Sequence, residues 1–514
     1  ELMRAHDVPL FTLETSTPVS ECDLLGITLP YELTYSNILE ALDMSGLALR
    51  SADRGAADPI VFGGGPCVYN PEPIAPFFDA ILIGEGEEAV LEIVAAHRKA
   101  KADGLDRQAT LRALADVPGV YVPSLYDAPV GPAGYTIAKP IADDVPMQVV
   151  KRVVADLDAH PAPVCPVVPF MDVVHDRAGI EVLRGCSRGC RFCQAGMVYR
   201  PVRERSADTI VRDSVAALAC TGYDEISLTS LSTTDHSQLS EVLRRLKRRL
   251  EGTGTNVSLP SLRVDAFGVE AARLVAGAGR KSGLTLAPEA GTQRLRDVIN
   301  KNVTEKDLLT AVSTAFNSGW RRVKLYFMIG LPTETDEDVA GIGALVAKVM
   351  EHARAATPPD QRGSVRVGVS VSTLVPKADT PFQWEGQIPI EQVWHKQAIL
   401  KASMPRKGID LSWHDAEVSL LEGAMARGGR EVSDAIEGAW RSGARFDAWT
   451  ERFALGRWTT AFTNAGLDLA TTASRTFGRH DELPWSHISA GVSSAYLWKE
   501  HERALSEQTT EDCT

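Results

Sequence analysis

The sequence predicts an α/β protein with three main parts: an N-terminal Rossmann-like domain, a partial (β/α)6 barrel and a mostly helical C-terminal region. Three observations predict this. Residues 1–100 alternate short apolar runs with amphipathic stretches. Residues 179–385 repeat that alternation six times. Residues 386–514 are mostly helical in pattern, and residues 101–178, which are rich in Pro and Val, connect the first two parts and are expected to form a hairpin or two.

The first 100 residues contain three candidate strands that are followed by turns or helices. The strands span 23–29, 58–62 and 79–83, and the helices span 36–44 and the stretch that ends near 100. This order indicates a parallel, doubly wound sheet. Glycine-rich turns after its strands let backbone approach a ligand, so they supply five candidate cofactor-binding residues. These are Gly63, Gly64, Gly65, Gly84 and Glu85.

The barrel is predicted from six apolar strands with helices between them. The strands are 180–183, 225–231, 257–264, 283–287, 322–329 and 365–374. The helices are about 206–220, 236–251, 268–279, 291–318 and 336–354. Six units are fewer than the eight of a closed barrel, and residues just past the C-terminal strand ends are expected to line the active site.

Composition limits the class of protein. The 514 residues predict two or three domains, and the net charge of −13 argues against a broad grip on nucleic acid. No apolar run is long enough to predict a membrane span, and no secretory leader is visible at Glu1, where we expect the chain to continue upstream. The eight scattered cysteines do not form a secreted disulfide framework, so we expect a cytoplasmic protein with reduced thiols.

Three cysteines follow the first barrel strand directly. Cys186, Cys190 and Cys193 have the spacing C-x3-C-x2-C. Their thiolates are soft ligands that suit an iron–sulfur cluster, and three of them leave one iron of a [4Fe–4S] cluster open. A structural zinc site would prefer a fourth ligand, which is not found nearby, and a disulfide would leave one thiol unpaired. We therefore predict these cysteines as the metal ligands and the catalytic centre.

With these cysteines and the barrel over 179–385, the chain resembles the radical S-adenosylmethionine (SAM) superfamily. The resemblance implies that the open iron chelates SAM and that the reduced cluster delivers one electron to its sulfonium. Cleavage of the C5′–S bond then yields a 5′-deoxyadenosyl radical. It also implies a one-electron donor such as flavodoxin or ferredoxin. The cofactors supply this chemistry, while the protein orients and shields them.

The resemblance also predicts SAM contacts at successive strand ends. A Ser-rich turn replaces the family's glycine-rich turn that binds the SAM amino group, and Arg263 is placed to pair with the carboxylate. Glu289 lies in a Glu-x-Gly-x-Gln segment that contacts polar groups of SAM. Each residue has a plainer interpretation as a helix cap, a surface ion pair or a turn. The predicted SAM-binding residues are Phe192, Ser230, Ser232, Arg263, Glu289, Gly330 and Pro376.

The glycine turns of the N-terminal part resemble the cobalamin-binding domain that precedes many radical SAM barrels, although the cobalt-ligating Asp-x-His-x-x-Gly motif is not in the chain. Residues 185–205 resemble a bacterial family of cobalamin-domain radical SAM proteins without an assigned substrate. This resemblance implies cobalamin as a further cofactor, with the glycine edge facing the barrel mouth. The alternative is an ancestral module kept as an interaction or lid domain.

Three functions remain open from the sequence. The leading one is modification of an unactivated C–H position, by methyl transfer where cobalamin binds. The second is methylthiotransferase-like modification of RNA or a ribosomal component without cobalamin. The third is a non-catalytic iron–sulfur scaffold or sensor. Five arginines around the cysteine loop either face an anionic partner or pair within the chain, and the second interpretation is favoured. They are Arg188, Arg191, Arg200, Arg203 and Arg205.

Overall fold

The computed structural model describes residues 2–131, 134–171, 173–259 and 284–512. The chain divides into two compact units of similar size. The first comprises residues 1–154, 375–390 and 415–498, and the second comprises residues 155–374, 391–414 and 499–514. The C-terminal region, which the sequence suggested as a separate part, is therefore shared between both units.

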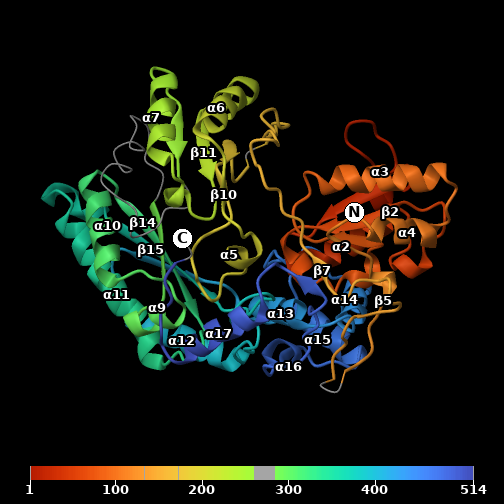
Figure 1. Ribbon diagram of the computed structural model, residues 1–514. Helices are drawn as coiled ribbons and strands as arrows, with labels where there is room; N and C mark the ends of the chain where they lie inside the picture. The colour runs from red at the N-terminus through yellow and green to blue at the C-terminus, as the bar shows by residue number, and fades with distance from the viewer. Residues whose placement is uncertain (1, 132–133, 172, 260–283, 513–514) are drawn as a thin grey trace. The chain divides into compact units, whose positions relative to one another are not determined.

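The first unit is built on a four-stranded sheet with the order β1-β2-β3-β4, of which β2 is labelled in Figure 1. Strands β1 (Leu24–Thr28), β2 (Ile60–Gly64) and β3 (Ala80–Leu82) are parallel, as predicted. Strand β4 (Val120–Tyr121) is antiparallel to β3, an addition that the sequence did not indicate. Helices α2 (Tyr35–Met44), α3 (Ala89–Ala102) and α4 (Arg107–Ala115) accompany the sheet. This confirms the predicted Rossmann-like α/β arrangement.

The rest of the first unit is mainly helical. It contains α13 (Ala416–Arg427), α14 (Val432–Arg441), α15 (Leu455–Asn464) and α16 (Leu469–Ser474). Helix α17 (Ser494–Leu505) belongs to this unit up to Trp498. Helix α14 packs against α2, and α13 packs against α16. The connecting segment forms an antiparallel pair, β5 (Tyr126–Asp127) with β6 (Lys139–Pro140), as the predicted hairpin requires.

The second unit contains two parallel sheets. One has the order β12-β11-β8, from β8 (Ala178–Glu181), β11 (Glu225–Thr229) and β12 (Asn256–Ser258). The other has the order β13-β14-β15-β16, from β13 (Leu284–Glu289), β14 (Arg322–Ile329), β15 (Arg366–Thr373) and β16 (Ile409–Trp413). The strands predicted for a partial barrel are confirmed; most of the one predicted at 257–264 lies outside the described residues. Strand β16 is a correction, because we predicted its region as helical.

Helices α6 (Ala207–Thr221), α7 (Leu239–Arg249), α10 (Glu305–Asn317), α11 (Asp336–Ala355) and α12 (Ile390–Ser403) belong to the second unit. The helix predicted over 268–279 lies outside the described residues. The single helix predicted over 291–318 is wrong. It is broken into α9 (Gln293–Val298) and α10, because Asn300 and Asn302 adopt positive φ angles of 51° and 50°. The break matters for the site, since Lys301 lies in it.

Strand β14 shows how the larger sheet divides its two faces. Val323, Leu325 and Phe327 are buried in the core, while Lys324 and Tyr326 alternate with them and are exposed. Period-two alternation places these two groups on opposite faces of the strand. The polar face of this sheet is called the inner face below.

A disulfide bears on the predicted compartment. Cys165 and Cys220 form a disulfide with a Cα–Cα distance of 5.4 Å, so the expectation that the scattered cysteines are reduced is wrong for this pair. It joins the segment before β8 to α6. Among the described residues, no helix is both long enough and apolar enough to cross a membrane.

Candidate functional site

The three predicted cluster ligands lie on a loop between β9 (Leu183–Arg184) and α5 (Gln194–Val198). The loop starts at Gly185, where φ is +88° and a Cβ would lie 2.7 Å from the carbonyl oxygens of Tyr199 and Pro201. At Gly189 a Cβ would lie 2.6 Å from Nδ2 of Asn300. Position 185 therefore requires glycine, whereas a side chain at Gly189 would displace the amide of Asn300.

The thiols of Cys186, Cys190 and Cys193 are free and partly exposed. Burial raises the pKa of all three, that of Cys190 to about 12, and the charges of the three thiolates act on one another. The backbone N–H of Gly196 donates to Sγ of Cys193 over 3.3 Å.

In the described part of the chain, no three His, Cys, Asp or Glu side chains converge on one ion. A cluster distributes its thiolates over separate irons, so its ligands need not meet at one point. Three soft donors of one loop thus fit a [4Fe–4S] cluster.

A buried ion pair lies beside two of these thiols. Nζ of Lys301 is 3.0 Å from Oε1 of Glu289 and 5.9 Å from the ring centre of Phe192. Burial lowers the pKa of Lys301, but Glu289 and the thiolates of Cys190 and Cys193 more than offset this and raise it. Two residues predicted from sequence, Glu289 and Phe192, are therefore gathered at the cysteine loop.

Sequence reasoning missed Lys301. The residue lies in the break between α9 and α10, and only its position in space relates it to the cysteines. Glu289 ends β13 with a φ of +67°, where the register with β14 shifts. Such an irregularity re-aims a side chain at the end of a strand, which is consistent with a role for Glu289 at this edge.

The Ser-rich turn after β11 is linked to the cysteine loop through a hydrogen bond and an ion pair. Oγ of Ser232 donates to Asp235 over 2.7 Å, and Asp235 pairs with Arg188 at 2.5 Å. The pKa of Cys186 is raised by burial and is also influenced by Asp235 and Arg188. Ser230 hydrogen-bonds to Thr233, with 2.8 Å between the two hydroxyl oxygens. Asp235 was not predicted; a carboxylate three residues after Ser232 was the available signal.

The other predicted SAM contacts either form hydrogen bonds with other residues of the chain or lie outside the described residues. Gly330 has a φ of +81°, and its N–H donates to Glu334 over 2.7 Å. The carbonyl of Pro376, in the first unit, accepts from Arg427 over 3.3 Å. Arg263 lies outside the described residues. Their role toward SAM therefore stays a prediction.

The predicted cobalamin glycines contact the chain itself. A Cβ at Gly63 would lie 3.1 Å from the ring of Phe78, and one at Gly65 would lie 2.9 Å from the carbonyl oxygen of Leu29. At Gly84 it would lie 2.3 Å from the carbonyl oxygen of Arg152. A Cβ at Gly64 would meet nothing within 4 Å. The carboxylate of Glu85 accepts from the N–H of Val154 over 2.6 Å.

Charged side chains also occupy this edge of the sheet. Lys377 pairs with Glu32 at 2.5 Å and with Glu422 at 2.9 Å, and Tyr31 donates to Glu422 over 2.7 Å. The thiol of Cys67 lies close enough to Glu32 and Lys377 for their charges to affect its pKa, which burial raises most. The residues predicted for cobalamin therefore do not form an open cradle, and we derive no step through it.

The five arginines around the cysteine loop donate within the chain. Arg191 is fully buried and donates to Glu500 over 3.1 Å and to the carbonyl of Gln508 over 2.7 Å. Arg188 pairs with Asp235 and Asp512. The remaining three, Arg200, Arg203 and Arg205, donate to backbone carbonyls. These contacts favour pairing within the chain over a face for nucleic acid.

Two family models match this chain. Residues 1–123 match the model for the N-terminal region of radical SAM proteins. Residues 180–346, which include the cysteine loop and most of the barrel, match the model for the radical SAM superfamily.

Two archaeal relatives and two solved structures are similar to the chain. The uncharacterized protein MJ0966 of Methanocaldococcus jannaschii is 28% identical over 440 residues, covering 84% of each chain. The uncharacterized protein MK0932 of Methanopyrus kandleri is 27% identical over 185 residues, 34% of each.

The first solved structure is the radical SAM methyltransferase TsrM from Kitasatospora setae, with cobalamin and a [4Fe–4S] cluster bound. It is 18% identical with a TM-score of 0.45, over 68% of this chain and 61% of that one. The second is the cobalamin-dependent SAM radical enzyme OxsB, with aqua-cobalamin and SAM bound. It is 14% identical with a TM-score of 0.43, over 82% of this chain and 59% of that one. The chain thus spans less than two thirds of either structure.

Proposed function

Because the chain belongs to the radical SAM superfamily, we propose that it modifies an unactivated C–H position of its substrate. It is a radical SAM enzyme, and its cofactors are a [4Fe–4S] cluster and SAM. The observation that carries the proposal is the loop with Cys186, Cys190 and Cys193 directly after the first barrel strands, with the Glu289–Lys301 pair beside it.

When bound, the cluster and SAM supply one-electron cleavage of the C5′–S bond and a 5′-deoxyadenosyl radical. The residues of the chain bind and orient them. The three thiolates hold the cluster, and the positive charge of Lys301 partly offsets theirs. Glu289, fixed by Lys301, is positioned to accept hydrogen bonds from SAM. Ser232 and Asp235, fixed by Arg188, offer polar groups on the other side of the loop.

The test is anaerobic reconstitution with iron and sulfide. We expect about four irons per chain and SAM-dependent release of 5′-deoxyadenosine. Replacing Cys186, Cys190 or Cys193 by Ala should abolish both. Cys22→Ala is the matched control, because Cys22 is a free cysteine of the first unit. Iron loading that survives the triple replacement would refute the assignment.

Methyl transfer with cobalamin is the finer form of this proposal. Its support is the resemblance of the N-terminal part to a cobalamin-binding domain; the internally packed glycines stand against it. The test is to purify the protein after growth with cobalamin and to measure its cobalt content and absorption spectrum. The result distinguishes methyl transfer with cobalamin from a reaction that uses SAM alone. One cobalt per chain supports methyl transfer. Cobalt well below one, with SAM still cleaved, leaves an enzyme that uses SAM alone.

The proposal includes two further expectations. A radical SAM enzyme needs a reductant, and we propose flavodoxin or ferredoxin as the one-electron donor. We propose the cytoplasm as the compartment; the Cys165–Cys220 disulfide is the observation against it, since cytosolic thiols are kept reduced. Modification of RNA is not proposed, because the arginines around the loop donate within the chain.

A further inference from the structure

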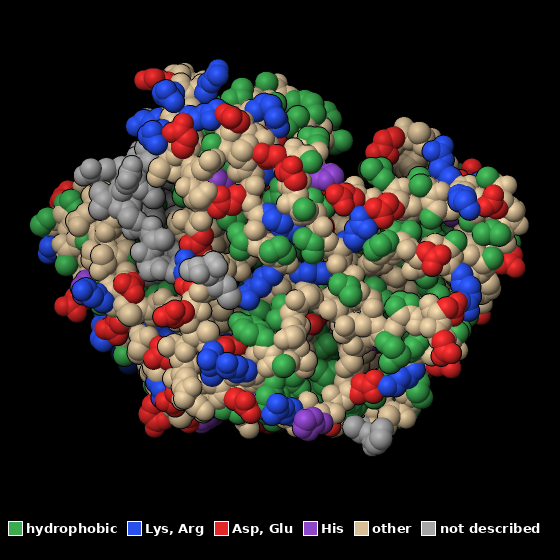
Figure 2. Space-filling model, viewed as in Figure 1, with side chains coloured by type: hydrophobic (Ala, Val, Ile, Leu, Met, Phe, Trp, Pro, Cys, Tyr) green, Lys and Arg blue, Asp and Glu red, His purple; other side chains and the backbone are tan. Residues whose placement is uncertain are grey.

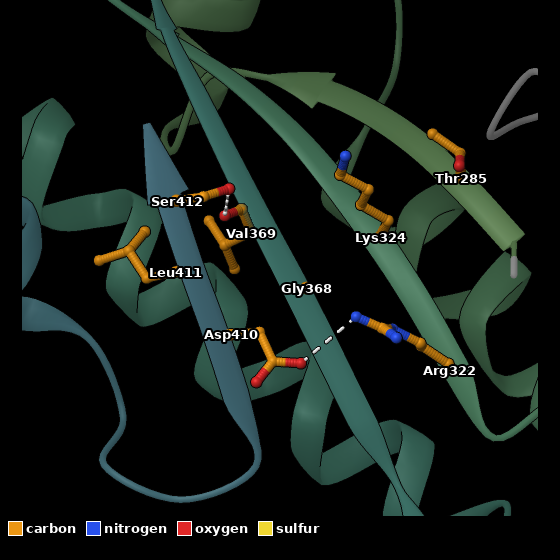
Figure 3. Close-up of a pocket in the computed structure, with 8 residues that line it drawn as sticks. All are labelled: Thr285, Arg322, Lys324, Gly368, Val369, Asp410, Leu411 and Ser412. Atoms are coloured by element: carbon orange, nitrogen blue, oxygen red, sulfur yellow. Dashed lines mark hydrogen bonds and ion pairs between the residues drawn. The ribbon is translucent and has the colours of Figure 1, made fainter. Parts of the chain in front are cut away.

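A pocket with charged side chains in its lining lies on the inner face of the second unit's larger sheet (Figure 3). Its volume is about 430 Å³, and strands β13 to β16 all contribute to it. It is lined by Thr285, Arg322, Lys324, Gly368, Val369, Asp410, Leu411 and Ser412. These residues lie in the N-terminal halves of β13, β14 and β15 and along β16, so the pocket is distinct from the predicted SAM contacts at the strand ends.

The backbone pattern explains why space exists here. Gly368 is the direct neighbour of Lys324 in the β14–β15 register, and both face inward. A side chain at Gly368 would lie in ordinary contact with the stem of Lys324, 3.6 Å from its Cγ. Because glycine has no side chain, the floor of the pocket stays open beneath the lysine.

The pocket has an excess of positive charge. Arg322 faces Asp410 across it, but the closest nitrogen and oxygen are 3.5 Å apart and both side chains are more than half exposed, so this pair is weak. Among the described residues, no carboxylate lies within ion-pair distance of Lys324, whose Nζ lies 4.7 Å from the ring centre of Tyr326. Within the described part of the chain, the pocket therefore contains two cations and one carboxylate, and that carboxylate pairs only with Arg322; the hydroxyls of Thr285 and Ser412 lie nearby.

We propose that this pocket binds a carboxylate or phosphate group at one end of the substrate. Lys324 is the principal contact and Arg322, which is only weakly paired with Asp410, is the second. Oxyanions bind such cations through charge-assisted hydrogen bonds, and the hydroxyl of Thr285 adds a further donor, whereas that of Ser412 donates to the carbonyl of Val369 over 3.4 Å. The inference rests on the proposed function, because it assigns the pocket to the substrate of the radical reaction.

The position of the pocket also limits the shape of the substrate. Lys324 precedes the end of β14 at Ile329 by five residues, roughly 16 Å at the strand rise of about 3.3 Å per residue. The inner face between them carries Tyr326, Met328, Ser370 and Ser372. A substrate anchored at Lys324 and reacting at the strand ends is therefore extended.

The test measures how fast the lysines of the reconstituted holoenzyme react with an amine-labelling reagent, read by mass spectrometry. The probes are inorganic phosphate and acetate, each compared with chloride at the same ionic strength. We expect either anion to slow labelling of Lys324 in a saturable way. Lys306, exposed on α10 at the outer side of the sheet, is the internal control and should not change. Stronger protection by phosphate or by acetate identifies the group.

Two variants sharpen the result. Arg322→Gln should weaken the protection of Lys324 by about tenfold, since it removes one charge-assisted contact. Lys306→Gln, the matched control, should leave that protection unchanged. Equal labelling of Lys324 in phosphate, acetate and chloride would overturn the inference. Release of 5′-deoxyadenosine is measured in the same samples, so loss of the anion site is distinguished from failure of the radical reaction itself.

Discussion

The Lys301–Glu289 pair offers the sharpest test of how this site is built. Two unit charges 3.0 Å apart attract by roughly 5 kcal/mol at the effective dielectric constant of about 20 that suits protein interiors. The side chains are 18% and 14% exposed, so water screens part of this attraction. Lys301→Met also leaves Glu289 as a mostly buried, unpaired carboxylate. We expect the second unit to lose about 2–4 kcal/mol of stability.

The assay is anaerobic urea unfolding of Lys301→Met, Glu289→Gln and the double variant. Because Glu289→Gln removes the unpaired charge, the double variant should be more stable than Lys301→Met alone, with a coupling of at least about 1 kcal/mol. Lys306→Met is the surface control and should have no effect. In the holoenzyme, losing this positive charge should also make the cluster harder to reduce. Additive effects of the two replacements, with an unchanged midpoint potential, would refute the reasoning.

Three further outcomes are expected. Gly84→Ala should destabilise the first unit by about 2–3 kcal/mol, because the new Cβ would meet a backbone carbonyl at a residue whose φ is +100°. Gly64→Ala, the control, should be close to neutral. Thermal unfolding measures both variants, and equal effects would contradict the packing argument. Burial raises the pKa of Asp379 to about 7, so the folded state holds a proton that the unfolded state releases near pH 4. Stability should therefore fall as pH rises from about 4 to about 7, and Asp379→Asn should remove that slope; a slope that persists in the variant would exclude Asp379 as its source. Thiol titration of the denatured apoprotein should find two fewer free thiols than after reduction, and mass spectrometry should locate the bond at Cys165 and Cys220; a full thiol count would show that the pair is reduced.

Long, regular patterns were predictable from the sequence. Strand β14 was predicted at its observed bounds, because its alternating first residues continue into an apolar run that ends at Ile329. Strand β16 was missed because its alternation of Ile409, Leu411 and Trp413 with polar neighbours is only five residues long. The break after α9 was missed because two asparagines with positive φ interrupt an otherwise helical pattern.

The site was predictable where a short segment carries the signal, as for the three cysteines and for Glu289. The spacing of Cys186, Cys190 and Cys193 is local, whereas Lys301 and Asp235 reach the loop through the fold. The N-terminal glycines show a different limit. A glycine pattern indicates that something approaches the backbone closely, but not what does so. At Gly65 and Gly84 it is the chain's own backbone.

The buried contact of Arg191 with Glu500 has a consequence for how the protein is made. Glu500 and the carbonyl of Gln508 lie near the end of the printed sequence, yet they hold a guanidinium between two of the cluster cysteines. While the ribosome is still translating the barrel, these partners do not exist, and the cysteine loop lacks part of its support. The loop reaches its final form only after residue 508 has been synthesised. We therefore expect delivery of iron and sulfide to this site to follow the synthesis of residue 508.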